Sequence, residues 1–317
     1  MARDIQISSV AIIGAGAMGA AYASIFDEAS GFLTSFVASG DRYHRLNRQR
    51  LVVNGRPLEI PIHRPEEMEE GADLIIVALK HHHLRRALPL IEAAAGVQTI
   101  ILSVTNGLVS EEIIGEVCGM DKMVWAMAVG IDAVREGQRF SYARSGKIVF
   151  GVKDPAADRD RIERLAGALE RAGICYEIPE DIERSLWWKF MVNVGINQAS
   201  ALLRAPYELF QCSAEARALM LLLMREVIVV AKKRGVDLSE ADLQQWLDLL
   251  DSLSPEGKTS MLQDMEARRK TEVEIFAGEV VAMAEKYGVP APANTVVLHT
   301  LKAMEEWYGK KEEKGLS

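Results

Sequence analysis

The sequence predicts an α/β protein in which a doubly wound, mostly parallel sheet precedes an all-helical carboxy-terminal domain. Short apolar runs alternate with helical segments over the first 179 residues, and a glycine-rich turn separates the first strand from the first helix. After residue 179 only helical periodicity remains. We therefore predict two domains, residues 1–179 and 180–317.

Continuous apolar runs are typical of strands that are buried on both faces of a parallel sheet. We expect strands at 8–13, 32–38, 73–79, 98–104, 123–129 and 174–178, and helices at 20–28, 42–50, 84–95, 111–117 and 159–172. Asn54-Gly55 is typical of a hairpin turn, and residues 137–151 resemble a meander. In the second domain, residues 218–231 predict a core helix that is too short to span a bilayer.

The composition narrows the class of protein. A net charge of −8 argues against a nucleic-acid partner, and the first residues show no signal-peptide pattern. Cys118, Cys175 and Cys212 lie far apart, without metal-ligand spacing, so we expect reduced, buried cysteines in a cytoplasmic protein. Apolar residues of the helical domain are compatible with a homodimer and equally with a buried core.

Three glycines, Gly14, Gly16 and Gly19, follow the first predicted strand and open the first predicted helix. In a dinucleotide-binding βαβ unit, such glycines allow a tight turn, let the pyrophosphate approach the backbone, and let helix and strand pack closely. The unit also has the expected size of about 30 residues. The sequence therefore predicts a Rossmann-type domain whose cofactor loop consists of Gly14, Ala15, Gly16, Ala17, Met18 and Gly19.

The position about 20 residues beyond this motif usually carries the acid that holds the ribose 2′-hydroxyl of NAD. Ser39 occupies that position here, and Arg42 and Arg45, which follow it, could bind the 2′-phosphate of NADP. Asp41 keeps NAD open as an alternative. We predict NADP, with Ser39 and Arg42 in its binding site.

Residues 186–197 place Lys189, Asn193 and Asn197 at intervals of four in an otherwise apolar segment. On a helix these side chains share one face and rise about 6 Å per step. A buried ammonium and two buried amides each need a partner, which a small polar ligand would supply. A structural lysine that reaches solvent, beside amides that tie helices together, would explain the same residues.

Together with the glycine loop, this face resembles the 2-dehydropantoate 2-reductase (ketopantoate reductase) family. Four other segments match in order: Val77-Ala-Leu-Lys80, Thr105-Asn106-Gly107, Ser260-Met-Leu-Gln-Asp264 and Arg269-Lys-Thr271-Glu272. The resemblance covers nearly the whole chain. It implies reduction of ketopantoate to pantoate by NADPH, a step toward pantothenate and coenzyme A, with the substrate in a cleft between the domains.

The resemblance also implies residue roles. Lys189 would be the proton donor, and Glu272 would lie at the junction of cofactor and substrate. Substrate contacts fall to Asn193, Asn197, Ser260 and Asn106, and further cofactor contacts to Lys80, Asn106 and Glu272. The residue types suit the chemistry, because hydride arriving at a ketone carbon builds negative charge on the oxygen. An ammonium among apolar rings is a stronger acid than one in water.

Two capping boxes are predicted in the late motifs. Ser260 with Gln263 indicates a helix start whose free N–H groups favour an anion, and Thr271 with Glu274 indicates a second start. In one straight helix Ser260 and Glu272 would lie about 18 Å apart. We therefore expect a break at residues 267–270.

The chain departs from the family pattern at four positions: Ser39, Asp132, Gln198 and Tyr207. Many members have arginine at the first, and proline commonly replaces Gln198. These departures leave open a different, bulkier 2-keto acid. A non-catalytic dinucleotide sensor is a further alternative, against which the intact Lys189 face argues.

Consecutive histidines 81–83 cannot all face one ion from a regular element, and we expect no metal site.

Overall fold

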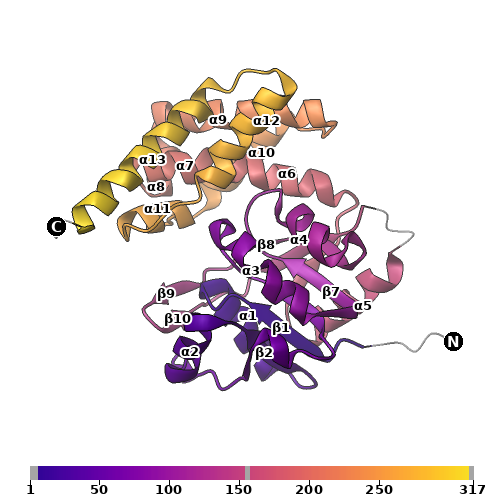
Figure 1. Ribbon diagram of the computed structural model, residues 1–317. Helices are drawn as coiled ribbons and strands as arrows, with labels where there is room; N and C mark the ends of the chain where they lie inside the picture. The colour runs from indigo at the N-terminus through magenta and orange to yellow at the C-terminus, as the bar shows by residue number, and fades with distance from the viewer. Residues whose placement is uncertain (1–5, 154–157, 314–317) are drawn as a thin grey trace. The chain divides into compact units, whose positions relative to one another are not determined.

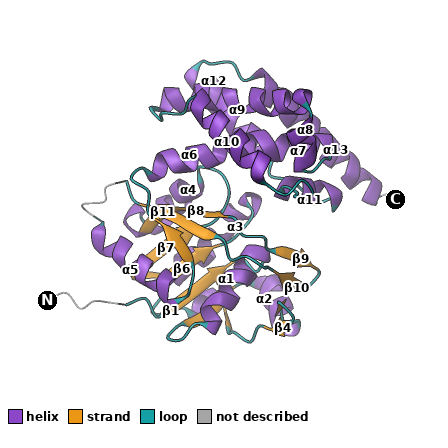
Figure 2. Ribbon diagram, turned by 180° about the vertical axis from the view of Figure 1, so that it is seen from behind, coloured by secondary structure: helices purple, strands orange, loops and turns teal. Residues whose placement is uncertain are grey.

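The computed structural model describes residues 6–153 and 158–313. The chain forms two compact units, Met1–Ile182 and Glu183–Ser317. The first contains the sheets and the second is built from helices (Figures 1 and 2). The predicted fold class is confirmed.

The first unit is organised around an eight-stranded sheet in the order β12-β11-β8-β7-β6-β1-β2-β5. Its strands are β1 (Ser9–Ile13), β2 (Leu33–Val37), β5 (Ile62–His63), β6 (Ala72–Val77), β7 (Ala95–Ser103), β8 (Met123–Val129), β11 (Lys147–Gly151) and β12 (Cys175–Glu177). Neighbouring strands are parallel except β8 and β11. The order reverses between β1 and β6, and ligands of such sheets bind beyond the carboxyl ends of the strands at this switch point.

Helices cover both faces of this sheet. They are α1 (Ala17–Glu28), α2 (Gly40–Arg48), α3 (His81–Ala94), α4 (Ser110–Cys118) and α5 (Arg159–Arg171), with 3₁₀ turns η1 (Pro65–Glu67) and η2 (Met120–Lys122). Alternate residues of β1 divide between two cores: Val10 and Ile12 join the core that includes α1 and α5, whereas Ala11 and Ile13 join the one that includes α3 and α4. Because both faces of the strands are buried, their sequences are continuous apolar runs.

A second, four-stranded sheet has the order β4-β3-β10-β9. It contains β3 (Val52–Val53), β4 (Arg56–Pro57), β9 (Val134–Glu136) and β10 (Arg139–Ser141). The hairpin at Asn54-Gly55 is confirmed, since both residues are left-handed, with φ of 47° and 80°. The prediction of a meander over 137–151 is wrong, because β10 pairs with β3 and only β11 joins the main sheet.

Asp132 holds the loop that leads from this second sheet back to β11. Its carboxylate accepts hydrogen bonds from the backbone N–H groups of Ala143 and Arg144, both at 2.9 Å. The bond from Arg144, the largest cause, lowers the pKa of Asp132. The departure at Asp132 thus has a structural explanation in the fold of the first unit.

Every regular element described in the second unit is helical. These elements are α6 (Ile182–Val192), η3 (Asn193–Asn197), α7 (Gln198–Leu203), α8 (Tyr207–Cys212), α9 (Ala214–Arg234), α10 (Glu240–Ser252), α11 (Ser260–Glu266), η4 (Glu274–Gly278), α12 (Glu279–Tyr287) and α13 (Pro292–Glu313). The predicted core helix is α9: Met220, Leu223, Met224 and Val227 are fully buried on it. Among the described residues, no helix combines the length and apolarity that crossing a membrane requires.

The expected burial of the cysteines is wrong. Cys175 and Cys212 are exposed and Cys118 is half-buried, and none forms a disulfide. Cys175 begins the edge strand β12, and Cys118 and Cys212 are the last residues of α4 and α8. A small apolar side chain at the end of an element escapes the core that a residue in its middle would join.

Candidate active site

Three predicted site segments lie at the carboxyl ends of adjacent strands of the first unit. The glycine loop follows β1, Lys80 follows β6 and precedes α3, and Asn106 follows β7. Hydrogen bonds continue beyond the strands, from Ala78 N to Ile13 O at 2.9 Å and from Val104 N to Val77 O at 3.0 Å. The sheet therefore brings the cofactor residues predicted in this unit to one edge.

Thr105 is a residue of this edge to which the sequence assigned no role. Its buried hydroxyl donates to the carbonyl oxygen of Leu79 at 3.2 Å and so joins the loop after β7 to the loop after β6. The bond fixes the backbone beside both Lys80 and Asn106. A hydroxyl directly after an apolar strand was the available signal, since a buried hydroxyl needs a partner.

The glycine loop has the three features that a pyrophosphate requires. Gly14 has a φ of +112°, and a Cβ atom there would overlap the carbonyl oxygen of Ala78. A Cβ atom at Gly19 would overlap the carbonyl oxygen of Gly14, so helix and strand are in close contact. At Gly16 nothing lies within 4 Å of the Cβ position. The backbone is open at the one glycine where a phosphate must approach.

The amino terminus of α1 offers its N–H groups to an anion. Gly16 is the N-cap residue and has no side chain that could accept these N–H groups, and the first turn contains no acidic residue. Ala15 is buried within the loop, whereas Ala17 and Met18, the first residues of the helix, are half-buried. No acidic residue of the first turn therefore neutralises the positive end of the helix dipole, which suits a phosphate.

Arg42 extends from α2 to the glycine loop and donates to the carbonyl oxygen of Ala15 at 2.6 Å. Burial, and then the positive charges of Arg45 and Arg135, lower the pKa of Arg42 to about 10. At neutral pH the guanidinium remains charged, and this crowding of like charge would be relieved by an anion. Arg135 comes from β9, which the sequence did not connect with the cofactor.

A surface pocket of about 410 Å³ on α2 is lined by Asp41, Arg42, Arg45, Arg48 and Gln49. Ser39 is exposed at the amino-terminal cap of α2 and makes no capping bond with its side chain. The residues predicted to choose between NAD and NADP are thus adjacent. Both the arginines and the competing carboxylate of Asp41 line the same pocket.

In the second unit, Lys189 and Asn193 are half-buried and Asn197 is buried, 7% exposed. They lie along the continuous segment formed by α6, η3 and α7. The prediction of a regular α-helix across this segment is wrong at its carboxyl end, because Asn193–Asn197 is a π-helix. In an α-helix, four residues rotate by about 400°, which is ~40° more than a full turn. A π turn contains about one residue more than an α turn, so the rotation from Asn193 to Asn197 no longer exceeds a full turn.

Gly195 explains how this wider turn is packed. A Cβ atom at Gly195 would lie 2.5 Å from two carbons of the Met224 side chain on α9. The absence of a side chain lets η3 lie directly against the core helix. π-Helices that interrupt α-helices are frequent at functional sites, and this one carries two of the predicted substrate residues.

The predicted break between Ser260 and Glu272 is confirmed. Helix α11 ends at Glu266, and Arg268 is left-handed, with a φ of 51°. Buried Asp264 accepts the Arg269 side chain through its carboxylate at 3.0 Å, and its carbonyl oxygen accepts the Arg269 N–H at 2.8 Å. The chain therefore turns sharply after α11, and Glu272 follows as a carboxyl-bearing residue that is 8% exposed.

Both predicted capping boxes are wrong. Thr259 caps α11 by accepting the N–H of Leu262 at 3.1 Å, whereas Ser260 is an exposed first helical residue. Thr259 is buried, so the neighbouring core selected it over the serine. Thr271 gives its N–H and its hydroxyl to the carboxylate of Glu305 on α13. Because Glu305 lies far along the chain, sequence spacing gave no signal for this partner.

Helix packing brings these parts of the second unit together. Helix α11 packs against α7 and η3, and η4 packs against η3. The segments that carry Ser260 and Glu272 therefore lie beside the segment that carries Lys189, Asn193 and Asn197. The predicted site residues form two groups, one in each unit.

Tyr207, a departure from the family pattern, contacts the loop that precedes Ser260. Its N–H donates to the carbonyl oxygen of Gly257 at 3.0 Å, and its ring leaves no room for a side chain at Gly257. Burial raises the pKa of Tyr207. The aromatic ring therefore fixes the loop that leads into α11.

Comparisons with known proteins agree with this organisation. Residues 10–155 match the family described as ketopantoate reductase PanE/ApbA, and residues 181–305 match its C-terminal counterpart. A 2-dehydropantoate 2-reductase from Archaeoglobus fulgidus is 26% identical over 302 residues, which cover 95% of this chain and 99% of the relative.

Two solved structures have the same fold. D-mandelate dehydrogenase, in a ternary structure with NADH and anilino(oxo)acetate, has a TM-score of 0.84 and 24% identity, over 95% of this chain and 99% of that one. Dimeric ketopantoate reductase from Staphylococcus aureus has a TM-score of 0.76 and 21% identity, with the same coverage. With both family matches in place, the chain belongs to the ketopantoate reductase family and is an NAD(P)-dependent oxidoreductase.

Proposed function

We propose that this protein reduces ketopantoate to pantoate with NADPH, a step toward pantothenate and coenzyme A. The observation that carries the proposal is the polar face of Lys189, Asn193 and Asn197, set in an apolar helix that widens into a π-helix at the two asparagines. Under this proposal residues 1–179 bind the cofactor, and residues 180–317 bind the substrate and supply the proton.

The residues of the first unit fit a nicotinamide dinucleotide, which supplies a hydride when bound. The open backbone at Gly16 and the amino terminus of α1 would hold the pyrophosphate. Arg42, with Arg45 and Ser39, would hold the 2′-phosphate, and we propose NADP over NAD for this reason. Lys80 and Asn106 would reach the nicotinamide end from the neighbouring strands.

The residues of the second unit would bind the keto acid and complete the reduction. Asn193, Asn197 and Ser260 would bind the hydroxyl and carboxylate groups of the substrate. As the ketone carbon gains hydride, its oxygen gains negative charge, and the Lys189 ammonium would donate the proton that converts it to a hydroxyl. Glu272 would lie at the reacting end as a buried carboxylate.

Steady-state assays of NADPH oxidation test the substrate. We expect kcat/KM to be highest for ketopantoate among ketopantoate, pyruvate, 2-ketoisovalerate and benzoylformate. Benzoylformate, the keto acid that corresponds to mandelate, tests the alternative, a reductase of a different, bulkier 2-keto acid. Absence of NADPH oxidation with ketopantoate would overturn the proposed substrate.

Lys189→Ala tests the proton donor. We expect turnover to fall at least ~100-fold, as for loss of a general acid, while the affinity for NADPH, measured by fluorescence titration, stays the same. Lys286→Ala on the exposed surface of α12 is the control and should leave turnover unchanged. Unchanged turnover in Lys189→Ala would refute the role of Lys189.

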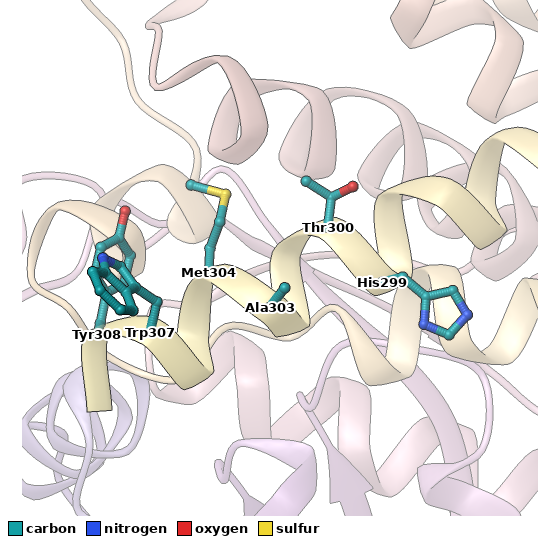
Figure 3. A pocket seen from close by; sticks show the side chains of 6 residues that line it. All are labelled: His299, Thr300, Ala303, Met304, Trp307 and Tyr308. Atoms are coloured by element: carbon teal, nitrogen blue, oxygen red, sulfur yellow. The ribbon is translucent and has the colours of Figure 1, made fainter. Parts of the chain in front are cut away.

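We propose a homodimer formed through α13. One face of this helix forms a shallow pocket lined by His299, Thr300, Ala303, Met304, Trp307 and Tyr308 (Figure 3). Val296 and Trp307 on the same helix are 64% and 59% exposed. Exposed large apolar side chains are typical of an interface, and the S. aureus relative is dimeric. Three unbridged cysteines also support a reducing, cytoplasmic location.

A further inference from the structure

The side chain of Gln198 is fully buried at the junction of η3 and α7. Its amide nitrogen donates to the carbonyl oxygen of Val194 at 2.8 Å, inside η3. Its amide oxygen accepts the N–H of Ala277 at 2.9 Å, inside η4. One side chain thus bonds to the backbones of both π-helices of the second unit.

A buried network holds this amide in one orientation. The amide nitrogen of Gln198 also donates to the side-chain oxygen of Asn294 at 3.2 Å. Asn294 is fully buried at the start of α13, and its own amide nitrogen donates to Glu226 at 2.8 Å. The same Glu226 carboxylate accepts the N–H groups of Ala293 and Asn294. The network fixes Gln198 between α9, α13 and the two π-helices.

π-Helices need such support from their surroundings. Their wider turns lose the regular hydrogen-bond geometry of an α-helix, and they persist where neighbouring structure determines them. The bond to Val194 satisfies a carbonyl oxygen within one wide turn, and the bond to Ala277 satisfies an N–H within the other. Loss of the amide would leave both buried groups without this partner.

Both π-helices adjoin proposed site residues. Asn193 and Asn197 are the first and last residues of η3. Glu272 lies just before η4, and its carbonyl oxygen accepts the N–H groups of Ile275 and Phe276 at 3.1 and 3.2 Å. A shift of η4 relative to η3 would therefore move Glu272 relative to the two asparagines.

We propose that Gln198 is a positioning residue, whose buried amide sets the spacing between the substrate asparagines on η3 and the Glu272 segment that leads into η4. The proposal rests on the proposed function, because it treats these residues as one substrate site. Gln198 itself need not touch the substrate. Its contribution is the fixed geometry of the groups that do, and small displacements of such groups reduce rates strongly.

Gln198→Met tests the proposal, since methionine has a similar shape but cannot form the amide bonds. We expect kcat/KM for ketopantoate to fall about 10- to 100-fold, with the affinity for NADPH unchanged. Hydrogen exchange at the Ala277 amide, measured by mass spectrometry of the peptide that contains it, should become faster.

Gln211→Met is the matched control. Gln211 also lies in the second unit, and its amide donates to two carbonyl oxygens, of Leu250 at 2.8 Å and Leu253 at 2.9 Å, away from both π-helices. This variant should lose stability without a change in kcat/KM. Equal effects of the two variants on kcat/KM would overturn the proposal, because Gln198 would then serve general stability alone.

A measurement on the unaltered protein covers the case in which Gln198→Met does not fold. We expect the side-chain amide NMR resonances of Gln198 to shift when pantoate is added in the presence of NADP, and those of Gln211 to stay in place. Unmoved Gln198 resonances on saturation with pantoate would overturn the proposal. If the unaltered enzyme does not reduce ketopantoate, the proposed function fails and the inference fails with it. If the unaltered enzyme reduces ketopantoate and Gln198→Met keeps kcat/KM within about twofold of its value, only the inference fails.

Discussion

Arg42 shows how one side chain connects the fold of the first unit with cofactor choice. Its guanidinium is held by the carbonyl oxygen of Ala15 within the glycine loop, close to the charges of Arg45 and Arg135. This arrangement fixes a positive group beside the proposed pyrophosphate site before any ligand binds. Preorganised charge of this kind favours an additional phosphate.

Arg42→Ala is therefore predicted to weaken NADPH more than NADH. Loss of one charge-assisted contact of about 1.5–3 kcal/mol corresponds to an increase of roughly 10- to 100-fold in the Kd for NADPH, while the Kd for NADH should change only slightly. Fluorescence titration of both cofactors measures the effect. Arg50→Ala, at an exposed arginine that pairs with Glu59, is the control. An equal loss of affinity for both cofactors would show that Arg42 supports the loop and does not bind the 2′-phosphate.

At the level of elements, Asp73 fixes the register of β1 against β6. Its carboxylate accepts the N–H of Ser8 at 2.8 Å, the hydroxyl of Ser8 at 3.0 Å and the N–H of Ser9 at 2.9 Å. Burial opposes the charged form, but these bonds outweigh it and lower the pKa of Asp73. The charged carboxylate thus stabilises the two strands that flank the switch point.

Asp73→Asn is predicted to lower the free energy of unfolding by about 1–3 kcal/mol at pH 7, as for loss of hydrogen bonds to a charged group. Because the folded-state pKa lies below the unfolded value, the stabilisation is present above the unfolded pKa of about 3.9 and is lost as pH falls through the folded value. Urea unfolding at pH 7 and pH 3 measures this, and the difference between variant and unaltered protein should shrink at pH 3. Glu69→Gln, at an exposed site, is the control. A stability difference between Asp73→Asn and the unaltered protein that does not depend on pH would contradict the explanation by a charged carboxylate.

The elements also differ in how far the sequence predicted them. Strands and helices of the first unit follow from apolar periodicity, because the sheet is buried on both faces. The π-helix at Asn193–Asn197 does not, since its residues have ordinary helical spacing and its wider turn depends on Gly195 against Met224 and on Gln198. The break after α11 was predicted correctly, although Asp264 and Glu305 hold it and the expected capping box does not.

At the scale of the whole molecule, the proposed homodimer makes α13 the element to test. Trp307→Glu places a charge on the exposed face of that helix and is predicted to convert a dimer into a monomer, because burying an unpaired charge opposes association. Light scattering after size-exclusion chromatography measures the mass. Val97→Glu, at an 87% exposed apolar residue of the first unit, should leave the mass unchanged. A monomeric unaltered protein would exclude the dimer.

The doubly wound fold, the all-helical second part, the glycine loop and the family could all be predicted from the sequence, because they depend on local periodicity and on motifs of fixed spacing. The residues that support the predicted site residues became apparent only from the packing of the folded chain. Arg135 near Arg42, Glu305 on Thr271 and Gln198 between two π-helices are partners from distant parts of the chain. Spacing along a sequence cannot identify such partners, because packing of whole elements brings them together.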